Sequence, residues 1–326
     1  MKIEGKKFLV IGGAGFIGSQ IVAELLKSNV REVSIYDNFA RGKISNIEKS
    51  LEDSRCKLFA DGGDIREVDV LNKAMKDVDG VFHVAAMWLL HCKDYPRTAF
   101  DVNIQGTFNV LEAAVNNRVK KVVYSSSASV YGDAVEIPMT ENHPFNNRNF
   151  YGATKIAGEA LCRAFYDRYG LDYVGLRYMN VYGPYQDQTA AYTGVIPIMM
   201  NKIEADETPE INGDGSQAYD FIAVSDVARA NILAMQSDTT DQFYNIGTGK
   251  QTSIRDLCEN ILEITNSKLH VTYRPYSEND QRQLVQNRIG STQKSKEELG
   301  FEYKVEIIEG LKDLWEWRTK NGGTKK

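Results

Sequence analysis

The sequence predicts an α/β fold in which a doubly wound parallel sheet carries a smaller C-terminal α/β lobe. In the first half of the chain, short apolar runs alternate with amphipathic stretches, a pattern typical of strands buried between two layers of helices. The expected strands cover residues 8–11, 32–36, 57–60, 80–84 and 121–125. After Arg177 the runs shorten and glycine and proline become frequent, which predicts the smaller, loop-rich lobe.

Composition narrows the possible partners. The net charge is -5 with acidic and basic residues interspersed, so we expect no nucleic acid partner. Apolar runs are too short to span a bilayer, so we expect no membrane partner either. Four widely spaced cysteines without a Cys-x-x-Cys pair argue against a metal site and against disulfides, and they favour a reducing cytoplasm.

A glycine-rich turn follows the first expected strand and opens a helix without an intervening loop. The turn consists of Gly12, Gly13, Ala14, Gly15, Phe16, Ile17 and Gly18. Glycines at this spacing allow a tight turn and close approach of the backbone to a pyrophosphate, and the helix N-terminus favours negative charge. The order of strand, glycines and helix therefore predicts a Rossmann dinucleotide site.

A carboxylate at the end of the second strand bears on the choice of cofactor. Asp37 can accept hydrogen bonds from an adenosine ribose, and it would repel a 2′-phosphate. The sequence therefore predicts NAD rather than NADP. Arg41 and Lys43 follow closely, and we interpret them as a solvated basic turn.

One tyrosine–lysine pair has the spacing of a catalytic unit. Tyr151 and Lys155 are four residues apart in a helical stretch and therefore share one helix face. An ammonium there can stabilise a phenolate and lower the tyrosine pKa, as a general base requires. Ser127 follows a strand at the carboxyl edge of the sheet, where it could bond a substrate hydroxyl or carbonyl.

Taken together, these motifs resemble the extended short-chain dehydrogenase/reductase superfamily over nearly the whole chain. They are most similar to nucleotide-sugar epimerases of the UDP-galactose 4-epimerase type. The matching motifs are the glycine turn, Asp37, Asp64-Ile65, Ala85-Ala86, Asn103, 125–132, Tyr151 with Lys155, 176–184, 213–215, Asp220-Phe221 and 245–247. The resemblance implies a NAD-binding Rossmann domain in 1–177 plus about 220–245, and a nucleotide-sugar lobe in 178–219 and 246–326.

The resemblance also implies roles for individual residues. Ser127, Tyr151 and Lys155 would be catalytic. NAD would be bound by Gly12, Gly15, Phe16, Ile17, Gly18, Asp37, Asn38, Gly42, Asp64, Ile65, Ala85, Ala86, Asn103, Ser125, Tyr151, Lys155 and Tyr178. Asp64 and Ile65 would contact the adenine, and Asn103 would order the tyrosine–lysine pair. The substrate would be bound by Ser127, Asn180, Val195, Ile196, Tyr219 and Arg282.

The implied reaction is epimerisation of a nucleotide-diphosphate sugar at C4 through a transient 4-keto sugar, within carbohydrate metabolism or polysaccharide biosynthesis. A dehydratase of this family places an acid pair where the chain has Ala128 and Ser129, which ranks dehydration lower. Decarboxylation or 4-keto reduction remains an alternative, as does a non-catalytic NAD-binding regulator, which the intact catalytic set disfavours. The resemblance further implies a homodimer formed through helices around 98–116 and 150–169.

Three segments depart from the family pattern. Tyr219 replaces an arginine, and the family's Arg-x-Gly-Asp run is absent near residues 276–282, so Arg282 or Arg288 could bind phosphate or be a solvated surface charge. The bulky run 87–92 could shape a substrate pocket, but a helix start or core contact is favoured. We interpret His83 as a core histidine and His91 as structural.

Overall fold

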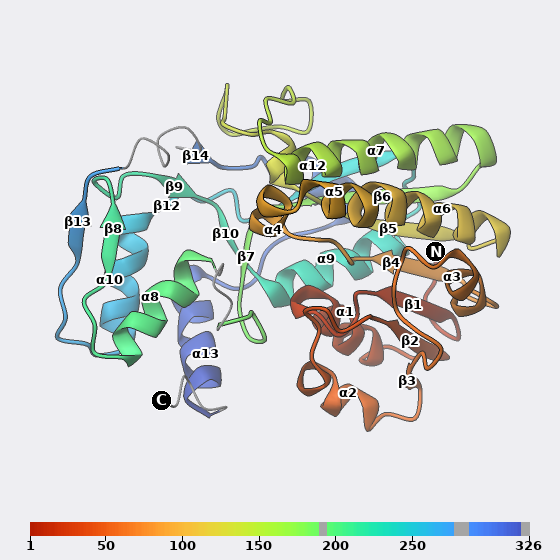
Figure 1. Ribbon diagram of the computed structural model, residues 1–326, viewed down its shortest axis with the longest axis horizontal. Helices are drawn as coiled ribbons and strands as arrows, with labels where there is room; N and C mark the ends of the chain where they lie inside the picture. Colours follow the sequence, from red (N-terminus) through yellow and green to blue (C-terminus); the bar gives the residue numbers. More distant parts are fainter. Residues whose placement is uncertain (189–193, 277–286, 321–326) are drawn as a thin grey trace.

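The computed structural model describes residues 1–188, 194–276 and 287–320, and it is built around a seven-stranded sheet (Figure 1). The strand order is β11-β6-β5-β4-β1-β2-β3, and every neighbouring pair is parallel. The strands are β1 Lys7–Ile11, β2 Glu32–Tyr36, β3 Cys56–Leu58, β4 Gly80–His83, β5 Lys121–Ser127, β6 Asp172–Tyr178 and β11 Gln242–Ile246. This arrangement confirms the predicted doubly wound α/β class.

Helices cover both faces of the sheet, which explains why its strands carry apolar residues on both sides. One face packs against α1 (Phe16–Leu26) and α9 (Val224–Gln236), and the other against α3 (Val68–Ala74), α6 (Gly106–Asn116) and α7 (Phe150–Tyr169). Along β1, Phe8 and Val10 join the first core, whereas Leu9 and Ile11 join the second. Successive side chains of a strand point to opposite faces, so each strand contributes to both cores.

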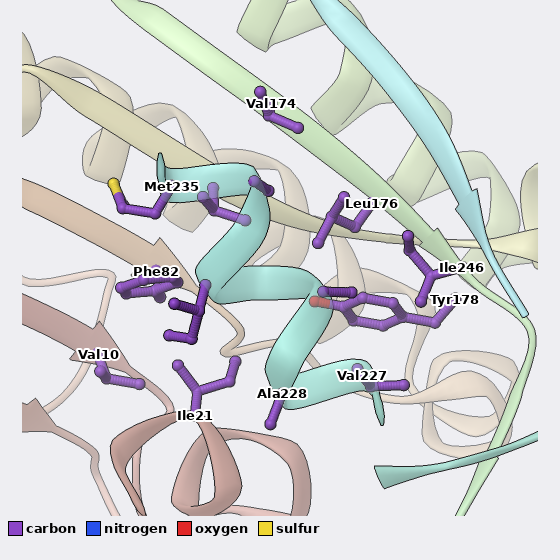
Figure 2. Close-up of a cluster of buried hydrophobic side chains, with 14 of the residues drawn as sticks. Val10, Ile21, Phe82, Val174, Leu176, Tyr178, Val227, Ala228, Met235 and Ile246 are labelled. Atoms are coloured by element: carbon purple, nitrogen blue, oxygen red, sulfur yellow. The ribbon is translucent and has the colours of Figure 1, made fainter. Parts of the chain in front are cut away.

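The packing between the sheet and α9 illustrates how the first core is held together (Figure 2). Phe82 of β4 and Leu176 of β6 lie against α9 residues that include Val227 and Met235, and all four side chains are fully buried. Burial of one such side chain contributes about 1.5–3 kcal/mol relative to full exposure. Tyr178 also points toward α9 in this view, which bears on its predicted role below.

A second unit stands beside the sheet and has its own core. Its helices are α8 (Val195–Glu204), α10 (Ile254–Ile264) and α13 (Ile307–Lys320), which lie side by side in Figure 1. Its strands form small sheets: β8 Glu210–Asn212 with β13 Thr272–Arg274, β7 Asn180–Tyr182 with β10 Phe221–Ala223, and β9 Ala218–Tyr219 between β12 Thr252–Ser253 and β14 Asn287–Arg288.

Short helices complete the described chain. They are η1 Ile44–Asn46, α2 Glu48–Leu51, α4 Leu89–Asp94, α5 Pro96–Ala99, the π-helix η2 Phe100–Gln105, η3 Ala128–Val130 and α12 Gln293–Leu299. Leu299 and Phe301 pack into the first core, so this part of the C-terminal segment lies on the larger unit. The division into two domains stays a prediction. Among the described helices, none has the length and apolar character needed to cross a membrane.

Candidate functional site

The glycine turn between β1 and α1 forms a cradle that only glycine permits. Gly12 has φ +83°, and a Cβ there would lie 2.7 Å from the Ala85 nitrogen. A Cβ on Gly18 would lie 2.0 Å from the Gly12 oxygen, so the helix start packs directly on the turn. Gly15 is the N-cap of α1 and provides no side-chain bond to the first-turn amides. These amides can therefore receive a pyrophosphate, and the cradle fits the dinucleotide that the sequence predicts.

The carboxylate of Asp37 lies directly against this turn. It accepts hydrogen bonds from the backbone nitrogens of Ala14 (2.9 Å) and Phe39 (2.8 Å), while burial raises the pKa of the carboxyl. A Cβ on Gly42 would lie 2.7 Å from Oδ1 of Asp37, so Gly42 leaves room for the acid. The structure thus places these two predicted cofactor residues at the turn, as the ribose contact requires.

The predicted adenine contacts differ in their accessibility. Asp64 lies beside Asn38, whose Nδ2 donates to Oδ2 over 3.4 Å, and a bond from Arg66 lowers the pKa of Asp64. Ile65 is only 3% exposed and packs against Gly106, where a Cβ would lie 2.5 Å from its Cδ1. Its contact with adenine stays a prediction, because its side chain faces the core.

The basic turn after β2 has a partner that the sequence did not indicate. Arg41 and Lys43 pair with Asp187 at 3.6 and 3.7 Å, and the Arg41 guanidinium lies 4.4 Å from the centre of the Trp88 ring. Both basic side chains remain partly solvated, as expected, so these pairs contribute little stability. They nevertheless join the turn to the segment that follows β7.

The predicted catalytic residues come together where β5 ends and α7 begins. Asn149 caps α7 through a 2.8 Å bond from the Gly152 nitrogen, which fixes the helix start. The Tyr151 side chain lies close enough to Ser127 for Ser127 to lower the pKa of Tyr151. Lys155 Nζ donates to the Ser125 carbonyl over 2.6 Å and lies 5.7 Å from the centre of the Tyr151 ring.

The pKa of Tyr151 departs from the expectation. Burial raises it to about 12, against smaller lowering effects of Ser127 and of the Arg288 charge. The ammonium of Lys155, which the spacing suggested as the lowering influence, donates to the Ser125 carbonyl, and burial lowers the pKa of Lys155 itself to about 8. Burial, a property of the tertiary structure, therefore dominates the titration of this pair.

Asn103 connects the loop after β4 with helix α7. Its Oδ1 accepts from the Met87 nitrogen (2.6 Å), and its Nδ2 donates to the Met87 oxygen (2.8 Å) and to Thr154 Oγ1 (3.0 Å). Thr154 immediately precedes Lys155, which supports the predicted ordering role. Ala85 and Ala86 lie half-buried in the same loop, and the Ala85 nitrogen bonds to the Ile11 oxygen (2.9 Å).

The side chain of Tyr178 is engaged in the core. Its hydroxyl bonds to Ser125 Oγ (2.9 Å) and to Asn231 of α9, and the residue is 6% exposed. The ring lies against the α9 face of the sheet (Figure 2), whereas Lys155 belongs to α7 on the other face. Any contact of Tyr178 with the cofactor would therefore come from its backbone at the end of β6.

The predicted substrate residues are spread along the small strands and α8. Asn180 Nδ2 donates to the Asp220 oxygen (3.2 Å), and Tyr219 lies half-buried on β9. Val195 is half-buried, but Ile196 is 2% exposed within the core of the second unit, so its side chain is not available to a ligand. Arg282 lies outside the described residues.

The structure resolves the choice that the sequence left open for Arg288. Its backbone oxygen accepts from the Asp220 nitrogen (3.0 Å), and β14 places it in register with Tyr219. The residue is half-buried with its Nε enclosed, and its charge acts on Tyr151, so it is not a fully solvated surface charge. The sequence named Arg288 only as one of two candidates, because a residue on a two-residue strand has no local pattern that would distinguish binding from exposure.

The bulky run after Ala86 is a helix start, as the favoured interpretation predicts. Helix α4 begins at Leu89, and Cys92 is fully buried. His91 lies between Trp88 and Tyr95, with ring centres 5.8 and 6.5 Å away, which is a packing role.

The buried His83 makes fold stability depend on pH. It is 1% exposed, its Nε2 lies 3.0 Å from Thr107 Oγ1, and burial, with a smaller effect of Lys155, lowers its pKa from 6.5 to about 3. Between these values the unfolded chain binds a proton that the folded chain does not. The free energy of unfolding should therefore fall as pH drops below about 6.5, by about 2 kcal/mol at pH 5.

Urea unfolding at pH 7.5 and pH 5 measures this effect, with His83→Gln as the matched variant. Glutamine can donate to Thr107 but does not titrate, so the variant should lose about 2 kcal/mol less than the wild type between the two pH values. Equal losses in both proteins would show that His83 is not the responsible group.

Comparisons with known proteins agree with this site. The model of the NAD dependent epimerase/dehydratase family matches residues 8–247. A putative UDP-glucose 4-epimerase from Methanocaldococcus jannaschii is 37% identical over 320 residues, covering 97% of this chain and 99% of the relative. A UDP-N-acetylglucosamine 4-epimerase from Methanobrevibacter ruminantium, solved with UDP-N-acetylmuramic acid, superposes with a TM-score of 0.90 at 33% identity, covering 98% and 99%.

A UDP-glucose 4-epimerase from Thermotoga maritima, solved with UDP-glucose, has a TM-score of 0.88 at 33% identity, covering 97% of this chain and 99% of its own. The family match spans most of the chain, including the glycine turn and the tyrosine–lysine pair. The chain therefore belongs to the NAD-dependent epimerase/dehydratase family, as an extended short-chain dehydrogenase/reductase of the epimerase type that uses NAD.

Proposed function

We propose that the chain inverts C4 of a nucleotide-diphosphate hexose through a transient 4-keto sugar. The observation that carries this proposal is the assembly of Tyr151, Ser127 and Lys155 at the carboxyl end of β5, in the same parallel sheet as β1, whose carboxyl end leads into the glycine cradle. The relatives named above are 4-epimerases of UDP-linked sugars. By analogy with these relatives, we propose that the nucleotide of the substrate is uridine diphosphate and that the substrate is a UDP-hexose.

Each catalytic residue has a role that follows from its position. Tyr151 takes the proton of the C4 hydroxyl and later returns it, and Ser127, which lies close enough to lower the pKa of Tyr151, holds the same sugar oxygen. Lys155 is fixed by the Ser125 carbonyl, from which its ammonium favours negative charge nearby. When bound, NAD supplies the oxidant that takes a hydride from C4 and the reductant that gives it back. No net redox change results, so the protein should retain its cofactor between turnovers.

The residues after Ser127 favour epimerisation over dehydration. Elimination of water from a 4-keto sugar needs an acid–base pair. The two positions where dehydratases of the family carry that pair are Ala128 and Ser129 in η3, which are 1% and 5% exposed and bear no carboxylate. A decarboxylase or a 4-keto reductase would use the same three catalytic residues. Net consumption of NADH would identify a reductase, and release of carbon dioxide a decarboxylase.

The same proposal includes a cytoplasmic homodimer acting in polysaccharide biosynthesis. Large apolar side chains are exposed along α5, η2, α6 and α7, which lie side by side in Figure 1. They are Tyr95, Phe100, Phe108, Phe150 and Tyr169. An exposed apolar surface of this kind is typical of a protein interface. Light scattering should give twice the chain mass of 36.7 kDa, and a monomer mass at all concentrations would contradict the dimer.

Proton NMR of the purified protein with UDP-hexoses tests the proposed reaction. We expect the C4 signal of the inverted sugar to appear without added cofactor. If no nucleotide hexose is inverted, and none changes the nicotinamide absorbance at ~340 nm, the chain is instead the non-catalytic NAD-binding protein.

A further inference from the structure

Arg288 occupies an unusual place for an arginine. It lies on β14, its carbonyl is bonded to the Asp220 nitrogen (3.0 Å), and Asn180 on β7 donates its own backbone nitrogen to the Asp220 oxygen (2.9 Å). Backbone hydrogen bonds thus connect Arg288 through Asp220 to Asn180, which is one of the residues predicted to bind the substrate. Gly290, two residues on, packs against Met179, where a Cβ would lie 2.3 Å from Cε. The backbone at Arg288 is therefore fixed rather than free to swing outward.

The side chain of Arg288 is half-buried, and its Nε is enclosed without compensation. This Nε has no hydrogen-bond partner within residues 1–188, 194–276 and 287–320. Among these residues, the groups that act on its charge include the phenols of Tyr219 and Tyr151 and the carboxylate of Asp133, whose residue is exposed. Burial of a cation is costly unless it is paired, so such a side chain is suited to receive an anion from a ligand.

The substrate of the proposed reaction carries its anion either in the diphosphate at C1 or in a carboxylate on the sugar. Tyr151, the base for the C4 hydroxyl, is close enough to Arg288 for each to shift the pKa of the other. In a pyranose ring C4 lies opposite C1 and next to C5, which bears C6. A cation near the C4 base is therefore better placed for an acid group at C6 than for the diphosphate.

We propose that Arg288 binds a carboxylate on the hexose, and hence that the preferred substrate is a nucleotide-diphosphate uronic acid. This inference rests on the proposed 4-epimerase function and specifies its substrate class. A guanidinium can bond both oxygens of a carboxylate in a fork, which discriminates well against a hydroxymethyl group. Tyr219, in register on the paired strand, is neutral, so Arg288 is the cation that this pair of strands contributes.

Two substrates that differ only at C6 test the assignment. UDP-glucuronic acid and UDP-glucose share the nucleotide, the diphosphate and the configuration of the hexose. We expect the wild type to prefer the acid in kcat/KM by at least about 100-fold, and Arg288→Gln to remove most of that preference. The readout is the ratio of kcat/KM for the two substrates. An effect of the Arg288 charge on Tyr151 would change both values equally, so it cancels in this ratio. Arg288→Lys, which keeps the charge but loses the fork, should fall in between.

Arg274→Gln is the matched control, since Arg274 is a mostly exposed arginine on β13 that pairs with Glu210. It should leave the preference unchanged, and thermal melting of each variant shows whether it is folded. An equal loss with both sugars in Arg288→Gln would make Arg288 a diphosphate contact, and a wild-type preference for UDP-glucose would also overturn the inference. Inversion of neither sugar would instead contradict the proposed function itself.

Discussion

Tyr151→Phe is expected to lower the rate of C4 inversion by at least about 100-fold, the usual scale for loss of a general base. The substitution removes the hydroxyl but keeps the half-buried ring, and the bond from Lys155 to the Ser125 carbonyl does not depend on that hydroxyl. The fold and the bound nicotinamide should therefore persist. Proton NMR gives the rate, and nicotinamide content per chain gives the occupancy.

Tyr182→Phe controls for the loss of a buried phenol hydroxyl as such. Tyr182 is 2% exposed, and its hydroxyl has no hydrogen-bond partner in the described part of the chain. Its removal should leave the inversion rate within about 3-fold of the wild type, as expected when no paired polar group is broken. Near-wild-type turnover by Tyr151→Phe would exclude Tyr151 as the base.

Gly18→Ala should abolish retention of NAD. The new Cβ would lie 2.0 Å from the Gly12 oxygen and 2.8 Å from its carbonyl carbon, both rigid backbone atoms. Helix α1 can accept the methyl group only by moving away from the turn, and the first-turn amides would then no longer converge on a pyrophosphate. We expect purified Gly18→Ala to contain less than about one tenth of the wild-type nicotinamide, in line with a loss of about 1.4 kcal/mol or more.

Gly170→Ala separates this local effect from general destabilisation. Gly170 ends α7 at φ +69°, and a Cβ at this position would meet no atom within 4 Å, so alanine there is strained but does not clash. It should lose about 1 kcal/mol of stability and still carry NAD. Full occupancy in Gly18→Ala would mean that the turn does not hold the cofactor as described.

The parts of the fold that were predictable depend on local patterns. Strand β1, the glycine turn and the acid Asp37 follow one another within a short stretch, and each is recognisable from its own residues. The pairing of Tyr151 with Lys155 was likewise predictable, because the spacing of four residues alone places both on one helix face. The expected strand borders lie close to the observed ones because strands also follow local apolar runs, although β5 continues to Ser127.

The parts that were not predictable depend on segments far apart in the sequence. The partner of Arg41 is Asp187, and the charge of Arg288, on a strand of two residues, acts on Tyr151. The pKa of Tyr151 follows from burial, which no spacing reveals. The orientation of Tyr178 depends on which face of β6 it occupies, and that is fixed only when α9 packs on the sheet.

A nucleotide hexose carrying deuterium at C4 tests the central claim most directly. If the C4 hydrogen leaves and returns within the site while Tyr151 handles only the hydroxyl proton, the inverted product formed in ordinary water should keep its deuterium at C4. Proton NMR of the product would then show no C4 proton signal. Appearance of a solvent-derived proton at C4 during inversion would contradict the account.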